Sequence, residues 1–279
     1  MTMSSETPQR LYLLQLGTST VPGAGRTLEM VLGCYLVETS NGRHILIDSG
    51  LPADAPLPPG AVPSARGKNV IEQLGDLGLR PDDIDILICT HFDPDHAGYH
   101  DAFTKAELIV QREHYELARS GHPRFATIRA HWDHPALRYR LIDGDTELLP
   151  GLTLLETGGH TPGHHWDHPA LRYRLIDGDT ELLPGLTLLE TGGHTPGHQS
   201  VLVRLPKSGA VLLAIDAVAV QRLFTPDRQA WPFDDNEEQL RASTRKLLDV
   251  VEREHVALVV FGHDGQQWQT LRRAPDYYE

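Results

Sequence analysis

The segment Thr90–Gly98 concentrates side chains that bind metal ions. It reads THFDPDHAG and offers four donors within six positions: His91, Asp93, Asp95 and His96. It follows a nearly continuous apolar run, IDILIC, which predicts a buried strand over 84–89. Because Pro94 prevents the strand from continuing, we expect a turn in which alternate side chains converge. Imidazoles and carboxylates held in this way are typical metal ligands, although a polar loop with a helix-capping aspartate is the alternative for this segment alone.

Further donors follow other apolar segments of the chain. Gly193–His198 reads GHTPGH, Asp216 follows the run VLLAI, and His263 follows VALVVF and a glycine. Each of these residues, taken alone, is more often a cap or a structural residue. Four such segments in order, each after a predicted strand, make that explanation a poor one for the whole set. We therefore expect one site assembled from all four segments.

The chain contains an exact internal repeat. Residues 131–164 and 165–198 are identical at all 34 positions. Repeat architectures drift in sequence and need about three or more units to bury a core. Two perfect copies therefore indicate a recent or engineered tandem duplication rather than a solenoid. We expect a single domain over 1–279 in which one copy is surplus to the fold.

Both copies end in GGHTPGH, but only one can complete the ligand set. His198 is followed by QSVLVRL, a predicted strand that can form a hairpin with the preceding GLTLLE, whereas His164 is followed by HWDHP, a poor strand. The sequence therefore favours His194 over His160 as the ligand. The surplus residues would be looped out, as copy one or in a shifted register such as 151–184, at a small cost in loop entropy. An exposed GLTLLE could then pair with a sheet edge or with a second chain.

The remaining pattern predicts interleaved strands and helices. Residues 52–67, rich in proline, glycine and alanine, are expected to form a loop. Asp235 or Asn236 is the expected N-cap of the longest helix. Interleaving of this kind favours an α/β or α+β class with covered sheets. Strands are expected over 11–16, 32–38, 44–48, 84–89, 107–110, 200–205, 210–215 and 256–261, and helices over 68–77, 111–119 and 236–254.

Composition excludes several kinds of partner. The formal net charge is −13, from 25 basic and 38 acidic residues, which argues against a nucleic acid or an anionic membrane. The sequence has no apolar run long enough for a transmembrane helix, and its first residues lack the apolar core of a secretory signal. The two cysteines, Cys34 and Cys89, exclude a disulfide scaffold and fit a reducing compartment. We therefore expect a cytoplasmic location.

The order of the motifs resembles the metallo-β-lactamase superfamily. ILIDSG, THFDPDHAG, GHTPGHQS, AIDA and FGHD occur in the family's order, and AELIVQREHY with GHTPGHQS is similar to the N-acyl homoserine lactone lactonases. The resemblance implies an α+β fold, the four-layer αββα sandwich, and a binuclear metal site. It places the first ion on His91, Asp93, His194 and Asp216, and the second on Asp95, His96, His263 and a bridging Asp216. It leaves His198, or His164 in the other copy, outside the ligand set.

Two residues depart from the family pattern. Asp93 stands where the pattern HxHxDH has its second histidine, and a third carboxylate moves metal preference from Zn²⁺ toward harder ions. Ala219 stands where lactonases of this branch often have a tyrosine that donates to the substrate carbonyl. Either another donor replaces that hydroxyl or the substrate differs. The resemblance implies two divalent ions, with Zn²⁺ first and Mn²⁺, Fe²⁺ or Co²⁺ as alternatives.

The activity that the resemblance implies is opening of the lactone ring of N-acyl homoserine lactones or similar lactones. A hydroxide bridging two ions would attack the carbonyl, the ions would stabilise the oxyanion and the leaving alkoxide, and Asp95 would carry a proton to the leaving group. Three ligating carboxylates and no evident lysine or arginine suit a neutral small molecule. Leu223, Trp231 and Phe233 are candidates for an acyl-chain pocket, with a role as loop anchors as the alternative, and a homodimer is allowed for.

Other functions remain open at this point. The superfamily also includes thioesterases, aryl esterases and organophosphate hydrolases. A non-enzymatic alternative is a decayed scaffold that binds metal without turnover, marked by Asp93, Ala219 and the duplication. Metal content discriminates between these readings, because an enzyme of this kind needs its ions and a decayed scaffold does not.

Overall fold

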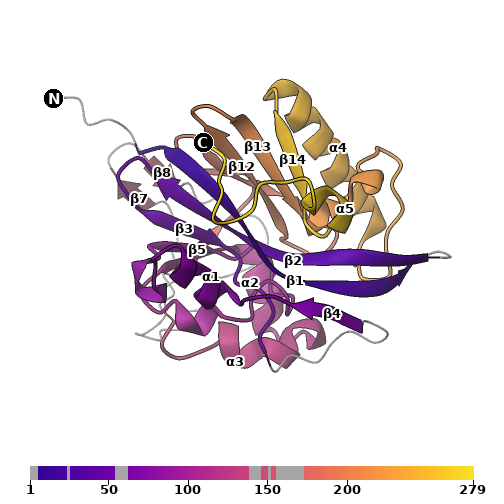
Figure 1. Cartoon of the computed structure of the whole chain (residues 1–279), viewed down its shortest axis with the longest axis horizontal. Helices are drawn as coiled ribbons and strands as arrows, with labels where there is room; N and C mark the ends of the chain where they lie inside the picture. The colour runs from indigo at the N-terminus through magenta and orange to yellow at the C-terminus, as the bar shows by residue number, and fades with distance from the viewer. Residues whose placement is uncertain (1–5, 24–25, 54–61, 138–145, 150–151, 155–172) are drawn as a thin grey trace.

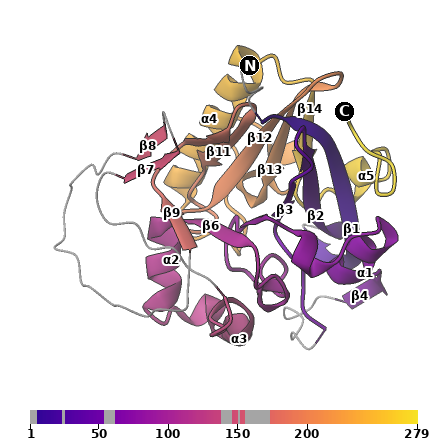
Figure 2. The same cartoon turned by 90° about the vertical axis from the view of Figure 1, so that its left-hand side faces the viewer.

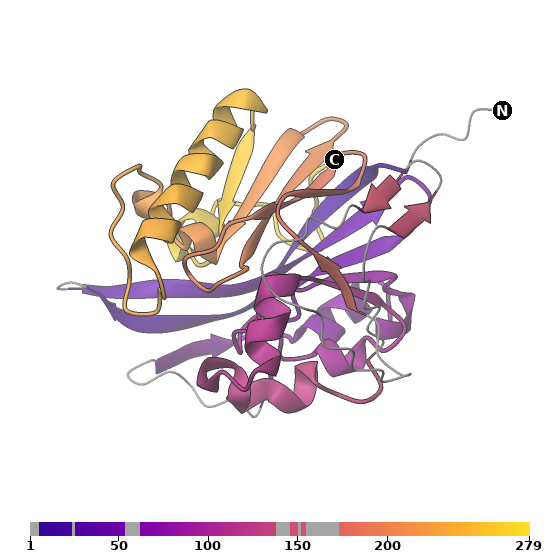
Figure 3. The same ribbon diagram turned by 180° about the vertical axis from the view of Figure 1, so that it is seen from behind.

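Two β-sheets lie face to face, with helices on both outer sides (Figure 1). The computed structural model describes residues 6–23, 26–53, 62–137, 146–149, 152–154 and 173–279. Figure 3, from behind, shows α4 (Glu237–Arg253) along one sheet and α2 (Arg112–Arg119) and α3 (Arg129–Trp132) along the other. The predicted four-layer α+β sandwich is therefore confirmed.

The first sheet has seven strands in the order β4-β1-β2-β3-β5-β6-β9. Its amino-terminal strands are antiparallel, whereas β3, β5, β6 and β9 run parallel to one another. Helix α1 (Val70–Asp76) lies on the same outer side as α2 and α3 (Figure 1). The strands are β1 (Pro8–Gly23), β2 (Arg26–Thr39), β3 (His44–Ile47), β4 (Val62–Arg66), β5 (Ile86–Ile88), β6 (Glu107–Gln111) and β9 (Tyr173–Ile176).

The second sheet has five strands in the order β10-β11-β12-β13-β14. It is antiparallel except for the pair β13 and β14, which is parallel. A short helix, α5 (Gly265–Trp268), follows the last strand. The strands are β10 (Thr180–Leu183), β11 (Leu186–Glu190), β12 (Gln199–Leu205), β13 (Gly209–Ile215) and β14 (Leu258–Phe261).

Three apolar layers hold the sandwich together. The central layer lies between the sheets and includes Leu13, Ile88, Val201 and Leu213. An outer layer packs the first sheet against α1, α2 and α3, and another packs the second sheet against α4. Strand β5 explains the continuous apolar run in the sequence: Ile86 and Ile88 face the central layer, whereas Leu87 faces the helices. Because both faces of β5 are buried, it ends as a rigid support for the loop that follows it.

Most of the predicted elements are present, and one predicted loop is partly wrong. Helix α4 begins after Asn236, whose side chain accepts a hydrogen bond from the Gln239 amide, as the N-cap prediction required. Within the loop expected over 52–67, however, residues Val62–Arg66 form β4, which pairs with the long strand β1. A proline-containing segment is tolerated there because β4 is an edge strand. Residues 54–61 lie outside the described residues.

The described fold takes residues from both copies of the repeat. Copy one supplies Trp132 and Leu137, which are buried against the first sheet, and copy two supplies the chain from β9 onward. Between them, β7 (Thr146–Leu149) and β8 (Leu152–Leu154) pair as a separate two-stranded sheet (Figure 2). Its register, Thr146 opposite Leu154, repeats that of β10 and β11, where Thr180 lies opposite Leu188. Which residues of the repeat are surplus stays a prediction, because residues 138–145, 150–151 and 155–172 lie outside the described residues.

Two observations concern membrane-spanning helices and the cysteines. In the described part of the chain, no helix combines the length and the apolar character needed to cross a bilayer. Both cysteines, Cys34 and Cys89, are buried free thiols.

Candidate metal centre

The predicted ligands meet where strands from both sheets end. The loop after β5 supplies His91, Asp93, Asp95 and His96, the loop between β11 and β12 supplies His194, and the ends of β13 and β14 supply Asp216 and His263. Their donor atoms form three overlapping groups, each within 4.8 Å. We name them cluster one (His91, Asp93, His194), cluster two (Asp95, His96, His263) and the bridging cluster (His91, His96, Asp216).

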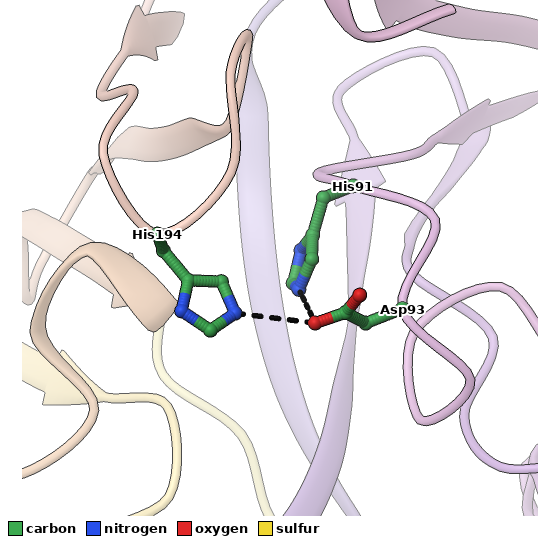
Figure 4. Close-up of side chains that lie close together, drawn as sticks. All are labelled: His91, Asp93 and His194. Carbon is green, nitrogen blue, oxygen red and sulfur yellow. Dashed lines mark hydrogen bonds and ion pairs between the residues drawn. The ribbon is translucent and has the colours of Figure 1, made fainter. Parts of the chain in front are cut away.

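Cluster one joins the two sheets (Figure 4). The Oδ2 atom of Asp93 lies 3.5 Å from His91 Nε2 and 3.2 Å from His194 Nε2. Asp216 Oδ2 lies 3.3 Å from the same His194 atom. Asp93 therefore points into the centre, where a ligand would have to be.

Cluster two lies on the other side of Asp216. The Oδ2 atom of Asp95 is 3.8 Å from His96 Nε2 and 3.7 Å from His263 Nε2. Asp216 Oδ1 is 2.9 Å from His263 Nε2 and 3.7 Å from His96 Nε2. The two oxygens of Asp216 thus face different clusters, which is the arrangement required of a bridging carboxylate.

Each of the four imidazoles is held at Nδ1, so that Nε2 faces the centre. Such outer partners fix the ring orientation and the tautomer of metal-binding histidines. The Nδ1 partners are Thr90 Oγ1 for His91 at 3.0 Å, Asp48 Oδ2 for His96 at 2.8 Å, Asp234 Oδ1 for His194 at 2.8 Å and the Val31 carbonyl for His263 at 2.7 Å.

The backbone adopts an unusual conformation to present Asp216. Ile215, immediately before Asp216, has φ 51°, a value that a β-branched residue rarely adopts. Gly262 leaves room for this turn, because a Cβ there would lie 2.7 Å from the Ile215 carbonyl oxygen and 3.0 Å from Asp216 Oδ1. The strain at Ile215 is typical of a functional site.

Asp48 is a functional residue that the sequence analysis did not single out. Its carboxylate is buried and accepts hydrogen bonds from the Thr90 amide at 2.8 Å and the Thr90 hydroxyl at 2.7 Å, besides its contact with His96. It therefore fixes both the start of the ligand loop and one ligand ring. The motif ILIDSG contained the signal, since its aspartate ends a buried strand.

His114 was also missed, and it connects the two ligand loops. Its Nε2 accepts the Phe92 amide at 2.7 Å, and its Nδ1 donates to the Pro196 carbonyl at 2.7 Å. Burial lowers the pKa of His114 to about 4, so the ring is neutral and can serve as donor and acceptor at once. It lies on α2, far from either loop in sequence. The quoted motif AELIVQREHY contains it, but the motif alone did not single out this histidine.

Arg124 corrects the expectation that the site contains no basic residue. Its Nε and Nη2 donate to the two carboxylate oxygens of Asp93, at 2.7 and 2.6 Å. Nη2 also lies 3.0 Å from His194 Nε2, and Nη1 donates to Asp235 Oδ1 at 2.8 Å. Arg124 belongs to a 3₁₀ segment, Pro123–Ile128, where neither periodicity nor spacing pointed to the site.

The centre stabilises positive charge. Burial lowers the pKa of His91 well below its usual value. At two other imidazoles the carboxylates outweigh burial: Asp95 and Asp216 raise the pKa of His96 to about 10, and Asp216 raises that of His263 to about 9. The pKa of the Asp216 carboxyl lies well below its usual value: burial opposes this shift, and His263 and His96 produce it. A buried group of carboxylates with this bias is a suitable site for a cation.

Two ligand atoms carry the signature expected of a metal site. The Nε2 atoms of His91 and His96 are buried and have no hydrogen-bond partner among the described residues. Unpaired buried nitrogens are costly, and a divalent ion would satisfy them. Cluster two and the bridging cluster therefore fit an ion. Cluster one differs, because Arg124 already contacts two of its three donor atoms.

The other predicted residues take supporting positions or lie outside the described residues. His198 is buried beside the centre, with Nδ1 2.9 Å from Thr191 Oγ1, and its Nε2 accepts the Asp216 amide at 3.3 Å. The Ala219 carbonyl accepts the His263 amide at 2.8 Å, and its side chain offers no donor. His160 and His164 lie outside the described residues.

The three substrate-pocket candidates lie in segments between Asp216 and α4. Leu223 is partly buried against the layer under α4, Trp231 stacks with Arg222 at 5.6 Å, and Phe233 is 54% exposed. The Phe233 carbonyl accepts a hydrogen bond from Arg124 at 2.9 Å, and the Trp231 amide donates to Asp234. The loop carrying both aromatics is therefore attached to residues that contact cluster one. These positions are compatible with a pocket wall and with an anchor.

Comparison with known proteins identifies the family of this chain. Residues 34–168 match the metallo-β-lactamase superfamily. An N-acyl homoserine lactonase of Bacillus thuringiensis is 31% identical, over 97% of this chain and 99% of its own. The N-acyl homoserine lactonase AttM of Azorhizobium caulinodans is 32% identical, over 97% and 98%.

Solved structures of lactonases also match this chain. An N-acyl homoserine lactone hydrolase with N-hexanoyl-L-homoserine bound at its catalytic metal centre matches with a TM-score of 0.74 and 28% identity, over 98% of this chain and all of that one. The dizinc quorum-quenching lactonase AidC, at 14% identity and a TM-score of 0.63, shares the fold. The chain belongs to the metallo-β-lactamase superfamily and is similar over nearly its full length to N-acyl homoserine lactonases.

Proposed function

We propose that this chain is a metal-dependent hydrolase that opens the lactone ring of N-acyl homoserine lactones, a quorum-quenching activity. The observation that carries the proposal is the buried set of imidazoles and carboxylates at the sheet ends, in a chain similar over nearly its full length to lactonases. A solved relative holds the ring-opened product at its metal centre, which makes the same bond the first candidate here.

The proposed metal ligands are the residues of the three clusters, with Asp216 facing two of them. If all three overlapping clusters took part in binding, the centre would hold the two divalent ions that the sequence analysis expects, with Zn²⁺ as the first candidate. Bound there, a divalent ion supplies Lewis acidity, which polarises a carbonyl and makes water acidic enough to attack it near neutral pH. We keep a cytoplasmic location and a homodimer as predictions.

The chain's own residues would orient the reaction and move the proton. Asp95 is the most exposed of the three carboxylates, with 28% of its side chain accessible against 13% for Asp93 and 7% for Asp216. It is therefore the carboxylate best placed to exchange a proton with a leaving alkoxide. The aromatic residues Trp231 and Phe233 are proposed to contact the acyl chain, because their loop is bonded to Arg124 and Asp234 at the centre.

Ring opening can be measured directly by following acid release from N-hexanoyl and N-decanoyl homoserine lactone. We expect turnover that disappears on chelation and returns with Zn²⁺ or Mn²⁺. Because Ala219 cannot donate a hydrogen bond through its side chain, an aryl ester, a thioester and an organophosphate should be tested in parallel. Metal-dependent turnover of one of these without lactone hydrolysis would reject the lactone assignment, and no turnover of any substrate by the metal-loaded protein would indicate the non-enzymatic scaffold.

A further inference from the structure

The position of Arg124 bears on how many ions the centre holds. A bound ion in cluster one would need lone pairs from His91, Asp93 and His194. His194 Nδ1 lies 2.8 Å from Asp234 Oδ1, and its Nε2 lies 3.2 Å from Asp93 Oδ2 and 3.3 Å from Asp216 Oδ2. The group nearest to Nε2 is Nη2 of Arg124, at 3.0 Å. The guanidinium therefore occupies the space beside His194 Nε2 and Asp93 Oδ2 that an ion bound to both atoms would need.

Asp93 is engaged by the same guanidinium. Arg124 binds both oxygens of its carboxylate in a fork, at 2.7 and 2.6 Å, the geometry of the strongest ion pairs between arginine and a carboxylate. The side chain of Arg124 is 17% exposed and that of Asp93 is 13% exposed. Breaking a buried pair of this kind leaves uncompensated charge and costs about 3–5 kcal/mol.

The other contacts of Arg124 hold it in place. Nη1 donates to Asp235 Oδ1 at 2.8 Å and to the Phe233 carbonyl at 2.9 Å. A guanidinium has five N–H groups, and these contacts together with those to Asp93 and His194 use all five. Arg124 is therefore a fixed part of the centre. An ion could enter cluster one only if Arg124 gave up several hydrogen bonds at once.

Charge gives an independent reason for the pairing. Asp93 carries one negative charge, and Arg124 places one positive charge beside it. The pair is neutral, so the charge facing cluster two and the bridging cluster is unchanged. His91 Nε2 and His96 Nε2, which have no hydrogen-bond partner among the described residues, remain available there with Asp216.

We propose that the guanidinium of Arg124 takes the place of a metal ion in cluster one, and that the chain holds a single divalent ion bound by donors of cluster two and the bridging cluster. This inference rests on the proposed metal dependence and narrows it. It replaces two ions with one ion and one fixed organic cation, and it assigns to Asp93 the role of anchor for that cation.

The test is a metal count that requires no substrate. The protein is stripped with a chelator, loaded with excess Zn²⁺ or Mn²⁺, dialysed and measured by mass spectrometry of the elements. We expect one ion per chain in the unaltered protein and two in Arg124→Gln, which frees Asp93 and His194. Asp93→His should also bind two, because it removes the carboxylate that anchors Arg124. Arg129→Gln, which removes an exposed arginine bound to Asp133, is the matched control and should stay at one.

A second measurement uses the unaltered protein, so that a variant that fails to fold does not end the test. Absorbance of bound Co²⁺, titrated into the metal-free chain, should saturate at one equivalent. Two ions in the unaltered chain, or one ion in both Arg124→Gln and Asp93→His, would overturn the inference. No bound ion at all would instead reject the metal dependence proposed above. One ion together with no lactone hydrolysis would reject the proposed substrate and leave the inference standing.

Discussion

At the scale of single residues, the ligands could be predicted and their supports could not. His91, Asp93, Asp95 and His96 form a dense local motif after a buried strand, which sequence alone can detect. Asp48 and Arg124 are single polar residues whose roles arise from tertiary contacts with that motif. The motif ILIDSG gave a weak signal for Asp48, whereas nothing in the neighbourhood of Arg124 distinguishes it from a surface charge. The expectation of a site without arginine was wrong for this reason.

Asp48 provides a prediction about metal affinity. Asp48→Asn removes a charged acceptor from His96 Nδ1 and weakens the bonds to Thr90, so the ring is less well oriented. Loss of such an outer partner typically lowers metal affinity about 10–100-fold. Competition with a chromophoric chelator should show a loss of this size. Asp85→Asn is the control, since Asp85 also accepts a backbone amide, that of His44, but lies away from the centre. An equal loss in both variants would mean that Asp48 acts only through general stability.

At the scale of elements, the metal centre depends on loops that a neighbouring helix holds together. Strand periodicity predicted β5, β12, β13 and β14, whose ends carry the ligands. It did not reveal that α2 joins two of the ligand loops through His114, because helix periodicity reports which face is buried and not what a buried polar residue contacts. The same limit applies to β4, whose pairing with β1 depends on the unusual length of that strand.

His114 gives a pH prediction at this scale. Its folded pKa of about 4 lies below the ordinary value of 6.5, so below pH 6.5 the unfolded chain binds a proton that the folded chain does not. This residue therefore lowers stability progressively as pH falls from 6.5 toward 4, with a slope of up to about 1.4 kcal/mol per pH unit. His114→Ala should remove that part of the slope. It should also cost about 1–3 kcal/mol at pH 7, because the buried Phe92 amide loses its acceptor.

Denaturant unfolding of the metal-free protein at pH 7 and pH 5 measures both effects. His44, which is partly buried and lies outside the centre, provides the control variant His44→Ala. If the stability of His114→Ala falls between pH 7 and pH 5 as steeply as that of the unaltered chain, the neutral bridge between the ligand loops is refuted.

The duplicated loop gives a prediction about which copy supplies the histidine of cluster one. The described structure places His194 in cluster one, between β11 and β12, whereas His160 lies outside the described residues. His194→Ala should break the contact with Arg124 and Asp234 and reduce lactonase activity at least tenfold. His160→Ala changes the identical residue of the other copy and should leave activity and metal content nearly unaltered. The opposite pattern would show that copy one supplies the loop, and equal partial losses would show that the copies exchange.

At the scale of the whole molecule, the repeat set the main limit on prediction. Two identical segments carry identical local signals, so only the residues that flank them could favour one copy over the other. In the described structure, Trp132 and Leu137 of copy one are buried against the first sheet, and β9 of copy two pairs with β6. The fold class could be predicted because the repeat does not change the order of the strands and motifs.

Removing one copy tests whether the duplicated residues contribute to the fold. Any deletion of 34 residues within the repeat, such as 138–171, gives the same 245-residue chain. It should retain the metal content and activity, because every ligand of the three clusters remains. Its stability should be equal or higher, since closing a shorter loop costs less entropy, about 0.6 kcal/mol per halving of its length. Thermal unfolding and metal analysis of both chains measure this. Size-exclusion chromatography adds a further comparison: β7 and β8 repeat the hairpin register of β10 and β11, so a dimer that forms only in the 279-residue chain would indicate that the extra hairpin pairs with a second copy. A 245-residue chain that is unfolded or metal-free would show that the duplication is required.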